Sequence, residues 1–132
     1  ATVGITHMLI GTLECTTERF DEGERSLRRA QSILEEALPS GHWRPAQARV
    51  RLGGCLAAVE RYDEAELLLQ AAWDVLEPQR AFRPIVWRYL IGALVDVNTA
   101  LGRPERAEEY RRLLPDSVVS SGADSPPNAP GA

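Results

Sequence analysis

Histidine and cysteine, two residue types that often act as bases and nucleophiles, are scarce in this chain. Its 132 residues include two of each. His7 and Cys15 are separated by about 12 Å along a helix axis, beyond the hydrogen bond that a nucleophile shares with its base. Cys15 and Cys55 lack metal-ligand or C-x-x-C spacing. We therefore expect no catalytic residue, no bound metal and no cofactor, and we expect both thiols to be free and to fill small spaces in the core.

The charged residues are numerous but dispersed. The chain has 15 basic and 19 acidic residues and a formal net charge of −4. Its acidic residues follow expected helix starts and exposed faces between arginines, which is typical of a solvated surface rather than of paired catalytic carboxylates. There is no clustered basic footprint for nucleic acid, and no apolar run of membrane-spanning length. Without a disulfide framework, the composition favours a reducing compartment, and we expect a cytoplasmic location.

Internal repetition is the most informative feature of the sequence. Arg19-Phe20-Asp21-Glu22-Gly23-Glu24 recurs as Arg61-Tyr62-Asp63-Glu64-Ala65-Glu66 and, more loosely, as Arg103-Pro104-Glu105-Arg106-Ala107-Glu108, so that the three copies are 42 residues apart (19, 61 and 103). Ile10, Leu52 and Leu94 keep the same spacing. A fixed period of this length predicts a solenoid whose units bury their apolar faces on one another.

Each period contains two helical patterns, and we expect an all-α fold of about three antiparallel helix hairpins in a right-handed α-solenoid. The second unit has one apolar stripe over about 45–60, through Val59. A second helix over about 62–77 should be covered on more than one face, because Leu67, Ala71 and Val75 lie off its main stripe. The units span about 3–38, 45–77 and 84–114, within a domain of 1–115. The Ser-, Gly- and Pro-rich stretch 116–132 is expected to be a disordered tail.

The small and large residues of these units resemble the tetratricopeptide-repeat (TPR) pattern. Leu52-Gly53, Ala65, Leu69 and Ala72 match its L-G, A, F and A positions, with Leu69 in place of Phe, and the 42-residue period resembles the longer kinesin light chain type. Over about residues 20–114, the runs 38–44, 52–56, 61–69, 102–107 and 110–114 look like the C-terminal TPR region of bacterial eukaryotic-like serine/threonine protein kinases. That resemblance implies a kinase domain upstream, since this chain has no kinase motif of its own.

The TPR resemblance also implies where a partner binds. The first helices of successive TPR hairpins line a concave face, and the matching residues that we expect to bind a partner are Gln47, Val50, Arg51, Gly54, Tyr89, Ala93 and Asp96, with Met8, Thr12 and Cys15 contributed by the first unit. The expected partner is a protein or peptide, recognised as a helix or an extended segment largely through apolar contacts.

The expected function is therefore a protein–protein interaction scaffold and not an enzyme. The alternative is an effector-sensing helical-repeat segment of a bacterial transcription regulator. The first helical segment carries apolar residues on more than one side, whereas the last segment is polar outside a single face. We accordingly expect further TPR units upstream of residue 1 and a cap near Leu114.

Overall fold

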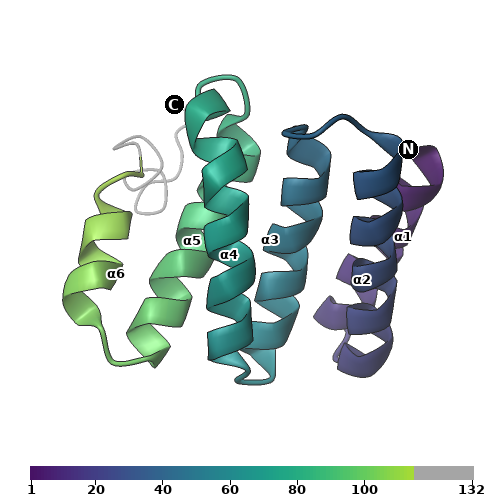
Figure 1. The fold of residues 1–132 in the computed structure, drawn as a ribbon. Coiled ribbons are helices and arrows are strands. Elements are labelled where there is room, and N and C mark those ends of the chain that lie inside the picture. The colour runs from purple at the N-terminus through teal and green to yellow at the C-terminus, as the bar shows by residue number, and fades with distance from the viewer. Residues whose placement is uncertain (115–132) are drawn as a thin grey trace, which may run out of the picture.

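The computed structural model describes residues 1–114, and this part of the chain consists of helices joined by short turns (Figure 1). The elements are α1 (Thr2–Thr16), α2 (Phe20–Ala37), α3 (Trp43–Ala58), α4 (Tyr62–Leu76), the 3-10 helix η1 (Glu77–Gln79), α5 (Pro84–Ala100) and α6 (Pro104–Arg111). No strand occurs within these residues, which confirms the predicted all-α class. The predicted tail, 116–132, lies outside the described residues.

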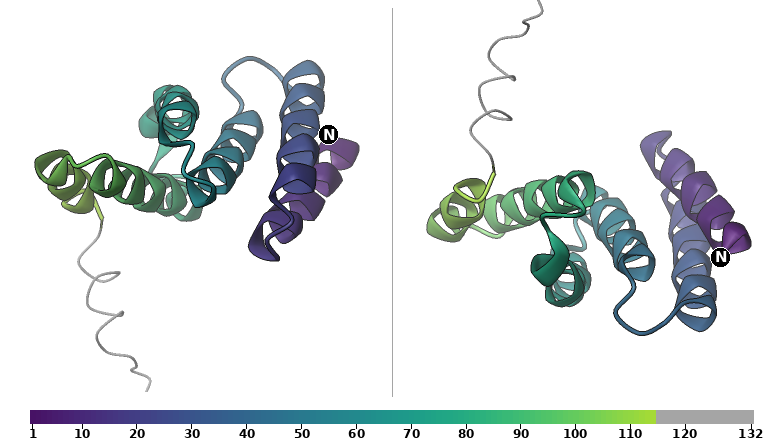
Figure 2. Two further views of the ribbon diagram at one scale, coloured as in Figure 1. Left: turned by 90° about the horizontal axis from the view of Figure 1, so that it is seen from below. Right: turned by 90° about the horizontal axis from the view of Figure 1, so that it is seen from above.

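The helices pack in three successive pairs, α1 with α2, α3 with α4 and α5 with α6. Each helix also packs against the next one along the chain, so that α2 contacts α3 and α4 contacts α5. The first helices of the pairs touch one another as well, α1 against α3 and α3 against α5. Figures 1 and 2 show the pairs following one another, from α1 and α2 at one edge to α6 at the other.

Close contact within the first two pairs depends on glycine. A Cβ atom placed on Gly11 would lie 2.7 Å from Cγ of Leu27, and one placed on Gly53 would lie 3.0 Å from Cδ2 of Leu69. These two glycines are 42 residues apart, as are the two leucines, and both leucines are fully buried. The repeated residues thus make repeated contacts, in which a leucine of the second helix fills the space that glycine leaves on the first.

The turns inside the three pairs also repeat. Glu18, Glu60 and Gly102 are spaced by 42 residues and have φ angles of 66°, 66° and 74°, in the left-handed region. Only the third of these positions has the residue that adopts this conformation without steric cost. Pro84 and Pro104 begin α5 and α6, where a missing N–H removes no helical hydrogen bond.

One expectation about an individual helix was wrong and another was wrong in part. Val59 does not continue the stripe of α3, because the helix ends at Ala58 and Val59 is exposed. Helix α4 is covered only in part outside its main stripe, since Leu67 is 74% exposed and Ala71 is exposed, whereas Val75 is half-buried against the core. Ala65, Leu69, Ala72 and Leu76 of the main stripe are fully buried. The neighbouring helices α3 and α5 cover one side of α4, and the side that carries Leu67 faces away from them.

The tryptophans pack between elements. The Trp73 ring of α4 lies 4.8 Å from that of Trp87 in α5 and 5.8 Å from that of Tyr110 in α6, which ties the second pair to the third. Trp43, at the start of α3, is half-buried. His42 caps that helix by accepting a hydrogen bond at Nδ1 from the backbone N–H of Arg44, at 3.1 Å. This hydrogen bond satisfies one of the backbone N–H groups that the start of a helix leaves without an intrahelical partner.

Candidate functional site

A groove of about 440 Å³ lies where α1, α3 and α5 run side by side. Each of the three helices contributes to its wall, so the groove exists only because the pairs pack in series. Its lining residues are Thr12, Cys15 and Thr16 of α1, Val50, Arg51, Gly54, Cys55 and Ala58 of α3, and Arg88, Tyr89, Gly92, Ala93 and Asp96 of α5.

The structure brings together six of the seven residues that we expected to bind a partner. Val50, Arg51, Gly54, Tyr89, Ala93 and Asp96 all line the groove, as do Thr12 and Cys15 of the first unit. Gln47 is not part of the lining, and its Oε1 accepts a hydrogen bond from Arg44 Nη1 at 2.9 Å. Met8 was misplaced by the repeat pattern, since it is buried in the core.

Two glycines on the groove wall are not required by the packing of the fold. A Cβ atom on Gly54 or on Gly92 would meet no heavy atom within 4 Å. Both glycines lie in the interior of a helix, where glycine is roughly 0.5–1 kcal/mol less favourable than alanine. Their effect is to hold the groove open and to expose helix backbone to whatever enters it. Sequence reasoning found Gly54 but missed Gly92. Gly92 stands 42 residues after Val50, at the equivalent position of the next unit.

The groove lining carries two arginines, Arg51 and Arg88, and one carboxylate, Asp96. The Arg51 guanidinium lies over the Tyr89 ring at 4.7 Å from the ring centroid, which orients both side chains. Arg44 and Arg83 lie outside the groove lining, near the starts of α3 and α5, at 4.2 Å and 4.3 Å from the centroid of the Trp43 ring. Within residues 1–114, neither these three arginines nor Arg88 pairs with a carboxylate. The chain is acidic as a whole, yet Arg51 and Arg88 give the groove lining positive charge that can attract a negative group.

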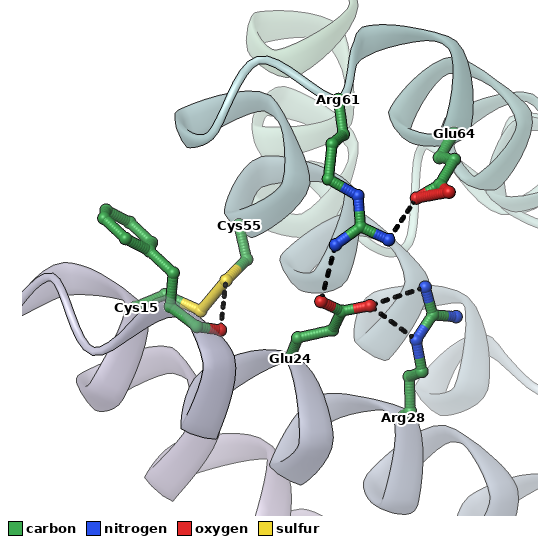
Figure 3. Close-up of polar contacts among 7 residues, drawn as sticks. Cys15, Glu24, Arg28, Cys55, Arg61 and Glu64 are labelled. Carbon is green, nitrogen blue, oxygen red and sulfur yellow. Dashed lines mark hydrogen bonds and ion pairs between the residues drawn. A yellow bond between two sulfur atoms is a disulfide. The ribbon is translucent and has the colours of Figure 1, made fainter.

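Cys15 and Cys55 form a disulfide in the groove wall, which corrects the expectation that both thiols are free (Figure 3). Their Cα atoms are 5.7 Å apart, and the bond joins α1 to α3. The two residues are 40 positions apart, close to the 42-residue period, so they lie at similar heights on neighbouring first helices. This near-coincidence is the signal that could have predicted the pairing. The expectation of a reducing compartment depended on the lack of disulfides, and the Cys15–Cys55 bond removes that argument.

Beside the disulfide, a carboxylate joins the first two pairs (Figure 3). Glu24 of α2 lies 2.7 Å from Nη1 of Arg61, which precedes α4, and 2.9 Å from Nη2 of Arg28. Partial burial on its own would raise the pKa of the Glu24 carboxyl, but the hydrogen bonds and charges of Arg61 and Arg28 outweigh burial and hold that pKa below its ordinary value of 4.5. The carboxyl stays ionised and keeps both arginines in place.

The lowered pKa of Glu24 predicts a pH dependence of stability. Its stabilising effect is fully present above pH 4.5 and is lost as the pH falls through the lower pKa of the folded state. The stability gap between wild type and Glu24→Gln should be widest at neutral pH and should narrow as the pH approaches 2, as measured by urea unfolding. Glu36→Gln, an exposed change on the same helix, provides the control. A Glu24→Gln gap that is equal at pH 7 and pH 2 would contradict the assignment.

Within the described residues, no three His, Cys, Asp or Glu side chains converge as a metal site would require. None of the described helices has the length and apolar character needed to cross a membrane. Comparison with protein-family models, with curated proteins and with solved structures found no match.

Proposed function

We propose that the chain is a protein–protein interaction scaffold, built as a right-handed α-solenoid of TPR-type hairpins, whose groove binds a helical or extended segment of a protein partner. The observation that carries this proposal is the open groove along all three first helices, where Gly54 and Gly92 leave space that the fold itself does not use. Exposed backbone and small side chains allow close approach of another chain. The TPR-like residue pattern and the 42-residue period support the same proposal.

The groove also indicates the chemistry of the segment. Small and apolar residues such as Val50, Ala58 and Ala93 favour apolar side chains on the partner. Arg51 and Arg88, which have no carboxylate partner within residues 1–114, favour an acidic residue next to them. Origin from a bacterial serine/threonine kinase with an upstream catalytic domain is a proposal from the sequence resemblance. The cytoplasmic location is a proposal that the disulfide between Cys15 and Cys55 leaves without its argument from cysteine usage. The location can be examined through the redox state of Cys15 and Cys55 in cells, because a disulfide persists in an oxidising compartment.

A large side chain inside the groove should weaken partner binding strongly without unfolding the protein. A peptide selected from a random display library on the wild-type chain is expected to lose at least about tenfold in affinity on Gly92→Leu, because the new side chain occupies the space of the partner. The chain should fold normally, since the new Cβ meets nothing within 4 Å and glycine is a poor helix former. Fluorescence anisotropy measures the affinity, and circular dichroism monitors folding.

Ala71→Leu is the matched control, because it adds the same side chain to an exposed position of α4, outside the groove. It should leave the affinity unchanged. If Gly92→Leu and Gly54→Leu both bind the selected peptides as wild type does, the proposed binding site is wrong.

The volume of the groove supports the effector-sensing alternative. A volume of about 440 Å³ falls in the range of pockets that hold small molecules. In that case, mass spectrometry of the denatured protein should detect a small molecule released by the wild-type chain and by Ala71→Leu but absent from Gly92→Leu.

A further inference from the structure

Helix α1 presents an apolar stripe to the outside of the molecule. Val3, Ile10 and Leu13 lie along one side of the helix, and their exposed fractions are 61%, 45% and 63%. No described helix covers this side, because α1 lies at the edge of the series (Figure 2). The stripe faces away from α2, which packs against Gly4 and Gly11.

The repeat register shows what covers this stripe in the other units. The positions 42 and 84 residues further along are Pro45, Leu52 and Cys55 in α3, and Trp87, Leu94 and Val97 in α5. All six are buried, and the two leucines are fully so. They face the preceding pair, since Trp87 packs 4.8 Å from Trp73 of α4 and the Cys55 sulfur lies 3.9 Å from the carbonyl oxygen of Phe20 in α2.

An ion pair between successive hairpins repeats in the same register. Arg61 contacts Glu24 at 2.7 Å, and Arg103 contacts Glu66 at 2.7 Å, each across 37 residues. Arg19 is the equivalent arginine of the first unit, and its only carboxylate partner within residues 1–114 is Glu22 of its own helix, at 3.6 Å. Arg61 makes that local pair too, with Glu64, in addition to its contact with the preceding unit. Arg19 therefore lacks the inter-hairpin carboxylate that the other two arginines have.

We propose that the stripe of Val3, Ile10 and Leu13 is the docking surface for the second helix of a further hairpin of the same type, contributed by a preceding repeat unit of the polypeptide, with a carboxylate of that helix on Arg19. Two independent observations agree, namely the burial of the equivalent residues and the repeated ion pair. The opposite end of the series does not offer a matching apolar surface to this stripe, because α6 exposes the charged residues Glu105, Arg106 and Glu109. The proposal does not depend on what the groove binds.

A designed extension tests the surface directly. A copy of residues 1–42, with its Cys15 replaced by alanine to avoid an unpaired thiol, is fused immediately ahead of Ala1. In the natural chain, residue 42 precedes Trp43, which is the register equivalent of Ala1. The copied Glu24 therefore lies the same 37 residues ahead of Arg19 that separate the natural pairs. The midpoint of thermal unfolding is expected to rise by about 5 °C or more relative to the natural chain.

A single substitution then reports whether the stripe is buried. In the natural chain, Ile10→Asp is at an exposed position and should shift the midpoint by less than about 2 °C. In the extended chain, the same change at the junction should lower the midpoint by about 10 °C. The matched control is Ile10→Asp in the added copy, which becomes the new exposed end and should have the small effect. Arg19→Gln should likewise lower the midpoint only in the extended chain.

Two results would overturn the proposal. One is an extended chain in which Ile10→Asp at the junction and in the added copy have equal effects, since the natural stripe would then be no more buried than the terminal one. The other is a natural chain that sediments as a dimer and becomes a monomer on Ile10→Asp, since the occupant of the stripe would then be a second copy of the chain.

Discussion

Replacing Cys15 and Cys55 together by alanine is expected to lower the free energy of unfolding by about 4 kcal/mol at 25 °C. The disulfide closes a loop across a sequence separation of 40 residues, and in the chain-entropy account a loop of this length restricts the unfolded ensemble by about that amount. The bond also joins the first helix pair to the second across the groove wall. Urea unfolding followed by circular dichroism gives the free energy and shows from the slope whether the transition stays cooperative.

Reductant provides the control for this experiment. Dithiothreitol should destabilise the wild-type chain by a similar amount and should leave the double alanine variant unchanged. Blocking thiols in the denatured, unreduced protein counts them directly, and the expected count is zero. Two free thiols, together with a wild-type stability that does not respond to reductant, would contradict the disulfide.

The second large effect is expected inside the second helix pair. Leu69→Ala should cost about 3 kcal/mol, because the side chain is fully buried against Gly53 and its removal leaves a cavity that a glycine cannot fill. Leu67→Ala, two residues earlier on the same helix, should change stability by no more than about 0.5 kcal/mol, since Leu67 is 74% exposed. Both values come from urea unfolding under identical conditions.

Comparing Leu69→Ala with Leu67→Ala tests which face of α4 is buried. The chemical change is identical, and only the face of α4 differs. Comparable losses at both positions would mean that the exposed side of α4 is covered in solution, and that the packing described for this pair is wrong.

The helical architecture could be predicted from the sequence because the same contacts recur at one spacing. The register that aligns Gly11 with Gly53 also aligns Leu27 with Leu69, and the structure places each leucine on its glycine. The positions where helices end were predicted less accurately. Val59 fits the apolar stripe of α3, but the chain turns at Glu60 with a positive φ angle that periodicity does not reveal.

The groove could be predicted in part, for a similar reason. The TPR resemblance selects the face of α3 and α5 that lines the groove, so Val50, Arg51 and Ala93 are among the residues expected there. It does not show how far a side chain reaches or which neighbour it prefers, and Gln47 is accordingly held by Arg44 outside the groove lining. The disulfide could not be predicted from a spacing motif, because cysteines pair by proximity in space, and its only signal is the near-period separation of Cys15 and Cys55.

The most direct test of the central claim, that the groove of α1, α3 and α5 is a partner-binding surface, is amide chemical-shift mapping by NMR. The ¹⁵N-labelled chain is titrated with a peptide selected on the wild-type protein. We expect the largest shifts at Gly54, Gly92 and their groove neighbours, with the exposed face of α4 around Leu67 and Ala71 unchanged. Shifts concentrated on α2 or on the outer face of α4, with Gly54 and Gly92 unperturbed, would contradict the account.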